Sequence, residues 1–333
     1  MIRLLRFLVS LLLLCCLSGY ASAKWIRDAE DIMGTRVSVE FWCDTGCDAK
    51  GTVAAVMDDM RSVDQQLSPY IETSELYAVN ARAASVPVKI SPSFFALLEK
   101  SLYYSRISNG AFDISFASVG FLYDYRRGIA PSDQEIKDKL PAINYHLIEL
   151  NKAQQTVRFH NPNLKIDLGG IAKGYAVDRS INILKQRGIT SAIVTAGGDS
   201  RILGDRHGTP WMIGIRHPRK KDAYAVRLPL ENSAISTSGD YERYFMEGEI
   251  RIHHIINPKS GKSADQVESA SILAPLAIDS DALSTTVFVL GVKQGLALVN
   301  SLPGVDAIII DGHTKLHFSD GLLQVDRKGD KQE

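Results

Sequence analysis

The chain has 333 residues, of which 45% are hydrophobic and 23% charged, and its 38 basic side chains are balanced by 38 acidic ones. This composition excludes a disordered chain, a collagen, a coiled-coil rod and a membrane protein with many spans. Zero net charge gives no global field for holding a polyanion, which argues against nucleic-acid binding, and the length fits one large or two ordinary domains.

Residues 1–23 have the three-part pattern of a secretory signal. Two arginines precede a short apolar run, and small residues end at Ala23. We therefore predict cleavage after Ala23, export, and a periplasmic location for a mature unit of residues 24–333. The alternative is lipidation at Cys15 or Cys16, which would anchor the protein to the inner membrane.

The mature part contains two cysteines, Cys43 and Cys47, with three residues between them. In an exported protein the simplest interpretation is a disulfide across a short loop at the end of a strand. Metal binding would need two further soft ligands nearby, and none follows. A redox role is disfavoured because redox pairs usually have two intervening residues.

Hydrophobic periodicity predicts the order of helices and strands. Val37, Val39 and Phe41 alternate with polar residues as in a half-buried strand, and a helix follows to Leu67 because apolar residues then recur every three or four positions. Further strands are predicted at 192–195, 211–215, 223–228, 252–256, 271–274 and 305–310, and helices at 92–105, 171–187 and 280–300. Short connections after residue 190 favour antiparallel pairing, so we predict one compact α+β unit.

The most informative stretch is KIDLGGIAKGYAVD, residues 165–178. A short apolar strand carrying Asp167 is predicted to pass through Gly169 and Gly170 into a helix, whose N-terminus would face a ligand. Lys173, one turn into this helix, would then reach an anionic ligand. The alternative is an ordinary strand-to-helix turn with a solvated lysine.

A second candidate site lies in DSDALST, residues 279–285. Asp281 and Thr285 are four residues apart, so on a helix their oxygens share one face. Hard oxygens are the ligands that magnesium requires, usually with phosphates and water completing the shell. The alternatives are an acidic residue favoured by the helix dipole and a hydroxyl bonded to its own helix.

Two adjacent histidines, His253 and His254, lie in RIHHIINPKSG, residues 251–261, on a predicted strand. Alternation places the two imidazoles on opposite faces, so one of them faces the interior or a cleft. A buried, hydrogen-bonded histidine is the commoner outcome, and a role in proton transfer is the more specific one.

Four motifs in register resemble the ApbE family of FAD:protein FMN transferases: DLGGIAKGYAVD, TSGDYERYF, HHIINPKSG and DALSTTVFVLG. The similarity runs from Met33 to about Gly291. It implies a single α+β unit related to T-folds. It also implies a reaction that cleaves FAD, places FMN on a threonine or serine of another protein and releases AMP. The acceptor would be a redox protein, membrane-associated or exported.

The resemblance also implies the residues of the site. Contacts to FAD are implied for Met33, Tyr70, Ala111, Phe112, Asp113, Asp167, Lys173 and Ile255. Magnesium would be held by the Gly170 carbonyl together with the side chains of Asp281 and Thr285. For the base that takes the proton of the acceptor hydroxyl, our hypothesis is His254.

The chain departs from the family pattern after Asp113, where residues 114–118 replace a common threonine and Gly-Pro pair, and at Gly170, where alanine is frequent. Two other functions remain open. With water in place of the acceptor, the chain would be an FAD pyrophosphatase that gives FMN and AMP. As an exported carrier, it would retain FAD without cleaving it.

Overall fold

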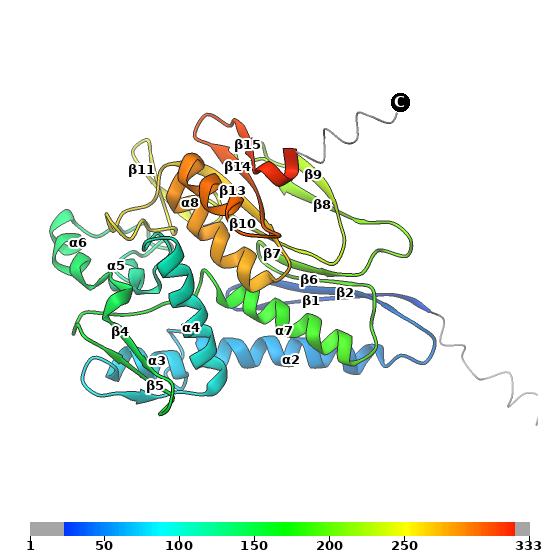
Figure 1. Cartoon of the computed structure of the whole chain (residues 1–333), viewed down its shortest axis with the longest axis horizontal. Coiled ribbons are helices and arrows are strands. Elements are labelled where there is room, and N and C mark those ends of the chain that lie inside the picture. Colours follow the sequence, from blue (N-terminus) through cyan, green and yellow to red (C-terminus); the bar gives the residue numbers. More distant parts are fainter. Residues whose placement is uncertain (1–22, 324–333) are drawn as a thin grey trace, which may run out of the picture.

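The computed structural model describes residues 23–323, so the predicted signal segment lies outside the described residues except for Ala23. The centre of this part of the chain is an eight-stranded sheet in which all neighbouring strands are antiparallel (Figure 1). In spatial order its strands are β1 (Lys24–Ile32), β2 (Thr35–Cys43), β6 (Ala192–Ala196), β7 (Asp199–Leu203), β10 (Ala234–Gly239), β13 (Val267–Ala274), β14 (Asp306–Asp311) and β15 (Leu316–Phe318). The predicted α+β class with a mostly antiparallel sheet is confirmed.

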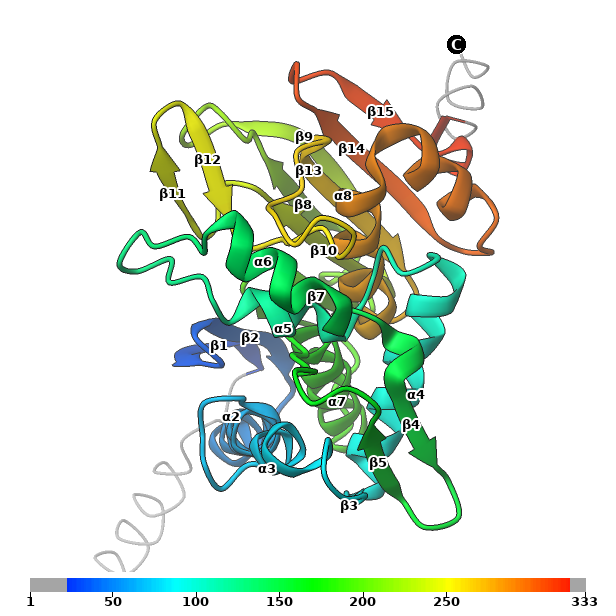
Figure 2. The same ribbon diagram turned by 90° about the vertical axis from the view of Figure 1, so that its left-hand side faces the viewer.

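Three long helices cover one face of this sheet (Figures 1 and 2). They are α2 (Ala49–Leu67), α7 (Ala172–Gln186) and α8 (Ala277–Asn300). Successive side chains of a strand point to opposite faces, which separates two cores. On β6, Ala192 and Val194 are fully buried in the main core beneath the helices, whereas Ile193 packs into a second core on the other face.

Two hairpins lie outside the main sheet. β8 (Trp211–Arg216) pairs with β9 (Tyr224–Leu230) and closes the second, smaller core. β11 (Tyr244–Glu247) pairs with β12 (Ile250–His253) as a separate two-stranded sheet.

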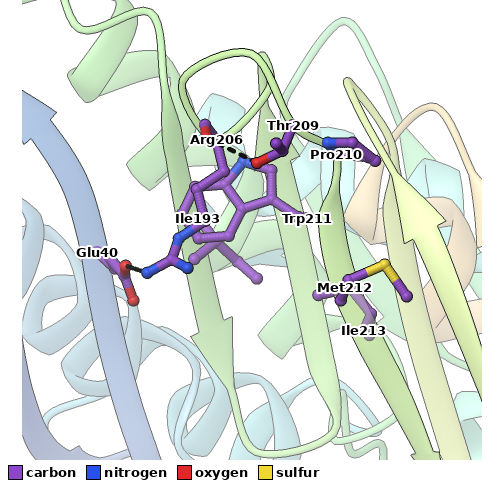
Figure 3. Close-up of a pocket in the computed structure, with 8 residues that line it drawn as sticks. All are labelled: Glu40, Ile193, Arg206, Thr209, Pro210, Trp211, Met212 and Ile213. Atoms are coloured by element: carbon purple, nitrogen blue, oxygen red, sulfur yellow. Dashed lines mark hydrogen bonds and ion pairs between the residues drawn. The ribbon is translucent and has the colours of Figure 1, made fainter.

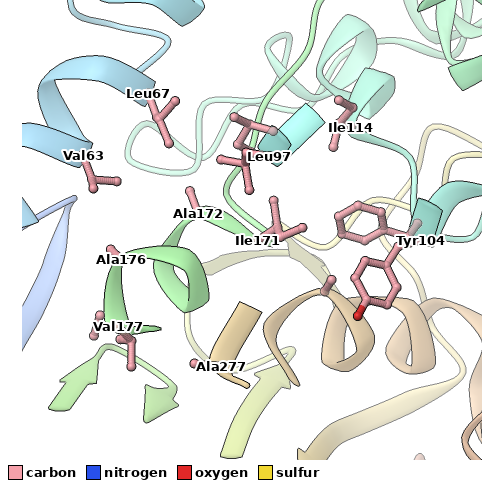
Figure 4. Packing of buried hydrophobic residues seen from close by; sticks show 14 of the residues in the cluster. Val63, Leu67, Leu97, Tyr104, Ile114, Ile171, Ala172, Ala176, Val177 and Ala277 are labelled. Atoms are coloured by element: carbon pink, nitrogen blue, oxygen red, sulfur yellow. The ribbon is translucent and has the colours of Figure 1, made fainter. Parts of the chain in front are cut away.

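A peripheral layer packs beyond the central helices. It contains α3 (Glu75–Arg82), α4 (Pro92–Ile107), α5 (Ala117–Gly120), α6 (Asp133–Lys139) and a small sheet of β3 (Val88–Lys89), β5 (Thr156–Phe159) and β4 (Ile148–Asn151). Figure 4 shows Leu97 and Tyr104 of α4 in the same packed region as Ile171, at the start of α7, and Ala277 of α8. The main core is therefore continuous from the sheet into this layer.

The crossing of α7 and α8 is unusually close. A Cβ atom on Gly174 would overlap the backbone carbonyl of Ala277, so only glycine fits at this position. Asp178, one turn further along α7, accepts hydrogen bonds from the backbone N–H groups of Ala277 (2.9 Å) and Ile278 (3.0 Å). A carboxylate on α7 thereby satisfies two free N–H groups at the start of α8.

By length and composition alone α8 could cross a membrane, since it has 24 residues and contains an 18-residue stretch with a mean hydropathy of 1.6. In this fold, however, it packs on the sheet beside α7, and its apolar residues belong to the main core. At Gly291, φ is +74° and the helix breaks. We therefore interpret α8 as a core helix.

Several predicted elements match the structure and two do not. Cys43 and Cys47 form the expected disulfide at the end of β2. The predicted strand at 252–256 is wrong beyond His253, because Ile255 and Ile256 are buried outside any strand and Ile256 forms only an isolated bridge with Ser263. The apolar segment before Gly169 is likewise not a strand. In both segments, burial of apolar side chains in a loop produced a strand-like pattern.

The close crossing leads to a prediction about stability. Gly174→Ala should lower the free energy of unfolding by about 3 kcal/mol. The added methyl group would overlap backbone atoms of Ala277, which cannot move aside by a change of rotamer as a side chain can. Urea unfolding followed by circular dichroism measures this change. The control is Lys185→Ala at an exposed position of the same helix, which should stay within about 0.5 kcal/mol of the wild type. Equal stabilities of the two variants would contradict the contact.

Candidate active site

The segment that carries Asp167 is extended but is held by side chains and not by a neighbouring strand. Asn80 makes two 2.8 Å hydrogen bonds to the backbone of Ile166, accepting from its N–H and donating to its carbonyl. The N–H of Asp167 donates to the carbonyl of Ile114 (3.0 Å). The Asp167 carboxylate then accepts from the N–H of Gly169 (2.7 Å), which shapes the turn into α7. Burial raises the pKa of Asp167.

Lys173 lies between two buried carboxylates. Its Nζ is 2.8 Å from the Asp199 carboxylate and 3.5 Å from that of Asp281, and it also donates to the Gly169 carbonyl (3.1 Å). The second oxygen of Asp281 accepts from the N–H of Gly174 (2.9 Å). Strand β7, helix α7 and helix α8 thus each contribute one member of a cluster formed by Lys173, Asp199 and Asp281.

This cluster places two buried carboxylates against the partly exposed ammonium group of Lys173. Burial and the nearby charge of Asp199 raise the pKa of Asp281 to about 7. Burial opposes the charge of Lys173, but the attraction of Asp199 and Asp281 outweighs it and raises the pKa of this lysine. When both carboxylates are ionised, the cluster has an excess negative charge that only an external cation can neutralise.

The predicted magnesium ligands lie together beside this cluster. Asp281 is 2% exposed, and Thr285 follows it one turn along α8. A Cβ atom placed on Gly170 would be 3.2 Å from the Oγ1 of Thr285, so the backbone of Gly170 approaches this hydroxyl closely. The Oγ1 of Thr285 is also 3.3 Å from the hydroxyl of Ser238 in the TSGDYERYF motif. One carboxylate, one hydroxyl and one carbonyl are hard oxygen donors of the kind that suits magnesium.

Within residues 23–323, no group of three or more His, Cys, Asp or Glu side chains is placed to hold a metal ion. The set of Gly170, Asp281 and Thr285 has only one carboxylate. Such a site fits a metal that takes its remaining ligands from phosphates and water. The oxygen donors of these three residues therefore suit a magnesium ion that also binds phosphate.

The two adjacent histidines have different environments, as alternation predicts. His253 is 3% exposed; its Nε2 is 2.7 Å from the carbonyl of Ala264, and its ring packs edge-on against Phe288. His254 is half-buried, and its Nδ1 has no hydrogen-bond partner among the described residues. Burial and the charge of Arg243 lower the pKa of His254 to about 3, so it is neutral at physiological pH.

The remaining residues predicted to contact FAD differ in how they are placed. Met33 lies in the β1–β2 turn at a φ of +55°, and this turn packs against Gly197, two residues before Asp199. Tyr70 is 79% exposed, with its ring 6.2 Å from that of Phe121. The other three, Ala111, Phe112 and Ile255, are buried.

Asp113 has its carboxylate occupied by the protein itself. One oxygen accepts from the N–H (2.9 Å) and hydroxyl (2.6 Å) of Ser115, and the other accepts from the N–H of Tyr145 (2.9 Å). In this structure the side chain therefore shapes the loop beside Asp167.

The sequence reasoning missed three residues that organise the site. Asp199 is not among the predicted site residues, although it makes the shorter ion pair with Lys173. Asp178, the last residue of the KIDLGGIAKGYAVD motif, has no predicted role, yet it anchors the start of α8. Arg243 was not singled out, and its charge influences the pKa of both Asp167 and His254. The Gly197-Gly198 pair that permits the tight turn before Asp199 was the available signal.

A pocket of about 580 Å³ lies elsewhere, next to the second core (Figure 3). It is lined by Glu40, Ile193, Arg206, Thr209, Pro210, Trp211, Met212 and Ile213, none of which is a predicted site residue. The guanidinium of Arg206 already pairs with Glu40 (3.0 Å) and lies over the ring of Trp211 (5.4 Å). The charges in this pocket are thus satisfied internally, and we place the active site on the helix-covered side of the sheet.

An α+β fold with an ion cluster of excess negative charge at a helix crossing defines a site suited to a cation and to the phosphates that a cation binds. Residues 33–309 match the ApbE family model, and the chain belongs to this family. It is 32% identical over 326 residues to the FAD:protein FMN transferase of Treponema pallidum. The aligned part covers 92% of this chain and 90% of that protein.

Further relatives support the same family. A Vibrio cholerae protein, also named FAD:protein FMN transferase, is 30% identical over 328 residues, which are 94% of this chain and 97% of that protein. The crystal structure of the ApbE protein from Thermotoga maritima gives a TM-score of 0.83 at 31% identity, over 90% of this chain and 99% of that chain. The match therefore extends over nearly the whole fold.

The raised pKa of Asp281 predicts how pH affects stability without metal. Folding favours the protonated form, so the stabilisation from this group is present below about pH 4 and is lost as pH rises through 7. Asp281→Asn should therefore stabilise the metal-free protein at pH 8, and the gain should be smaller at pH 5 by about 2 kcal/mol.

Urea unfolding at both pH values, with a chelator present, measures this difference. Asp138→Asn on the exposed side of α6 is the control and should show no such dependence. If Asp281→Asn destabilised the protein equally at both pH values, the site would not carry the excess negative charge described above.

Proposed function

We propose that this chain transfers FMN from FAD to a threonine or serine hydroxyl of an acceptor protein and releases AMP, in a reaction that requires magnesium. Membership of the ApbE family and the names of its relatives support the transferase class. The observation that carries the proposal is the cluster of Lys173, Asp199 and Asp281 beside Thr285 and Gly170.

Gly170, Asp281 and Thr285 would hold the magnesium ion. When bound there, magnesium would supply positive charge that offsets the negative charge of the FAD pyrophosphate. Asp199 keeps the ammonium group of Lys173 close to Asp281, so a second positive charge is available beside the same phosphates. The chain thereby meets the first requirement of phosphoryl transfer, which is charge neutralisation.

The chemistry then needs a nucleophile and a base. The hydroxyl oxygen of the acceptor forms a bond to the phosphorus of the FMN half, the pyrophosphate bond breaks, and AMP leaves. His254 takes the hydroxyl proton, since it is neutral and has an unpartnered nitrogen. The negative charge of bound FAD favours the protonated imidazole, which makes His254 a stronger base in the complex.

The N-terminal sequence supports a proposal for the acceptor and the compartment. We propose an exported or membrane-associated redox protein as acceptor and the periplasm as location, because the N-terminal pattern is that of a secretory signal. Lipidation at Cys15 or Cys16 remains the alternative for the N-terminal segment.

The proposal is tested by intact-protein mass spectrometry of candidate redox proteins after incubation with this chain, FAD and magnesium. A covalent FMN adduct on threonine or serine is expected, together with AMP. A chelator should abolish both products. Release of FMN and AMP without any adduct would instead indicate a pyrophosphatase, and FAD that stays bound and intact would indicate a carrier.

His254 leads to a separate prediction about rate. Its replacement in His254→Asn should lower kcat by about 10²- to 10⁴-fold at saturating acceptor, because a positioned base is lost. The Kd for FAD, measured by flavin fluorescence, should change little. His160→Asn on the small peripheral sheet is the control, since His160 is exposed and pairs only with Glu149. A normal kcat for His254→Asn would show that another group takes the proton.

A further inference from the structure

The β11–β12 hairpin has a free edge. β11 pairs with β12 from Tyr244 opposite His253 to Glu247 opposite Ile250. Within residues 23–323, no other strand pairs with β11. Figure 2 shows β11 as the outer strand of the hairpin, beside the loop that precedes α6.

The register tells which backbone groups point outward. In an antiparallel pair, directly opposed residues alternate between those that exchange two hydrogen bonds and those that exchange none. The two-residue turn at Gly248 makes Glu247 and Ile250 a bonded pair. Two and four residues back along β11, Phe245 and Arg243 are then also bonded to the opposite strand, which agrees with the hydrogen bond from the His254 N–H to the Arg243 carbonyl (3.1 Å). The N–H and C=O groups of Tyr244 and Met246 therefore point away from β12.

Side chains hold the hairpin in position and leave this edge accessible. The ring of Phe245 packs within 3.8 Å of the Gly128 position and lies 6.1 Å from the ring of Tyr125. By contrast, Tyr244 and Met246 are 41% and 52% exposed. An unpaired, exposed edge with apolar side chains is a typical template for an added strand, and β11 offers such an edge over four residues.

The edge is continuous with the candidate active site. β12 ends at His253, so the next residue along the chain is the proposed base, His254. Arg243 precedes β11 and is bonded to His254 through its backbone. An added strand that continues past Tyr244 therefore lies opposite Arg243, with Arg243 between it and His254, and the acceptor chain beyond the end of this strand turns toward His254.

We propose that the free edge of β11 binds an extended segment of the acceptor protein as an added antiparallel or parallel strand, next to the hydroxyl that receives FMN. This inference rests on the proposed function. A hydroxyl on a folded protein has to reach His254, and the backbone groups of Tyr244 and Met246 fix the neighbouring acceptor residues by their main chain. In recognition of this kind, main-chain hydrogen bonds supply affinity and the alternate side chains of the added strand supply specificity.

The test uses the acceptor that the wild-type chain labels in the mass-spectrometric experiment. Met246→Pro removes the outward N–H but no bond of the hairpin, and Met246→Ala is the matched control that keeps this N–H. We expect kcat/KM for the acceptor to fall about tenfold or more in Met246→Pro and less than threefold in Met246→Ala, with an unchanged Kd for FAD. Circular dichroism checks that both variants are folded.

Amide hydrogen exchange on the wild type provides a measurement that needs no variant. Protection of the Tyr244 and Met246 amides should appear only when the acceptor is added. Unchanged exchange, or equal transfer by both Met246 variants, would overturn the docking proposal while leaving the transferase intact. Protection that rises with the concentration of this chain alone would assign the edge to a second copy and overturn it too. If the wild type labels no acceptor at all, the proposed function itself fails.

Discussion

Helices α7 and α8 touch at the level of their backbones, and the geometry of the site depends on this contact. The missing side chain at Gly174 lets α8 approach until the Asp281 carboxylate accepts a hydrogen bond from the Gly174 N–H. Asp178 fixes the start of α8 from the other side. With both helix positions set, Thr285 is brought next to Gly170. A wider spacing would separate the three proposed metal ligands, which come from two different helix ends.

The same contact explains why the site is electrostatically unbalanced. Two carboxylates share one ammonium group where little water can reach, and this arrangement costs stability in the absence of a ligand. A core that served only to stabilise the fold would favour apolar residues at these positions. Residues that oppose folding in this way are typical of sites that bind a charged ligand.

Much of the fold could be predicted from the sequence because its signals are local. Apolar periodicity located α2, α7 and α8 closely, and a spacing of four placed Asp281 and Thr285 on one face. The positions of β7 and β10 were not predicted, since these strands mix apolar residues with serine. On β10, Ser236 is buried and Ser238 is partly buried, and their hydroxyls pair with serines of α8, which depends on the tertiary fold.

The candidate site was predicted only where a motif carried it. Lys173 and Asp281 lie 108 positions apart, and no local pattern indicates that Lys173 pairs with both Asp199 and Asp281. The sequence predicts strands around Asp167 and Ile255, but both segments are loops. A buried loop and a buried strand can have the same run of apolar residues, so the sequence pattern does not distinguish them. Side-chain bonds such as those of Asn80 decide between the two, and they are visible only in three dimensions.

The anchoring of α8 by Asp178 also determines when the site can exist during folding. The bond from Asp178 to Ala277 spans 99 positions, and the one from Gly174 to Asp281 spans 107. Contacts of such long range form late, because the entropy of closing the intervening loop has to be offset first. A chain that lacks α8 contains β1, β2 and α2 but no binding site. The protein therefore acquires its ligands only after nearly all of its sequence is available to fold.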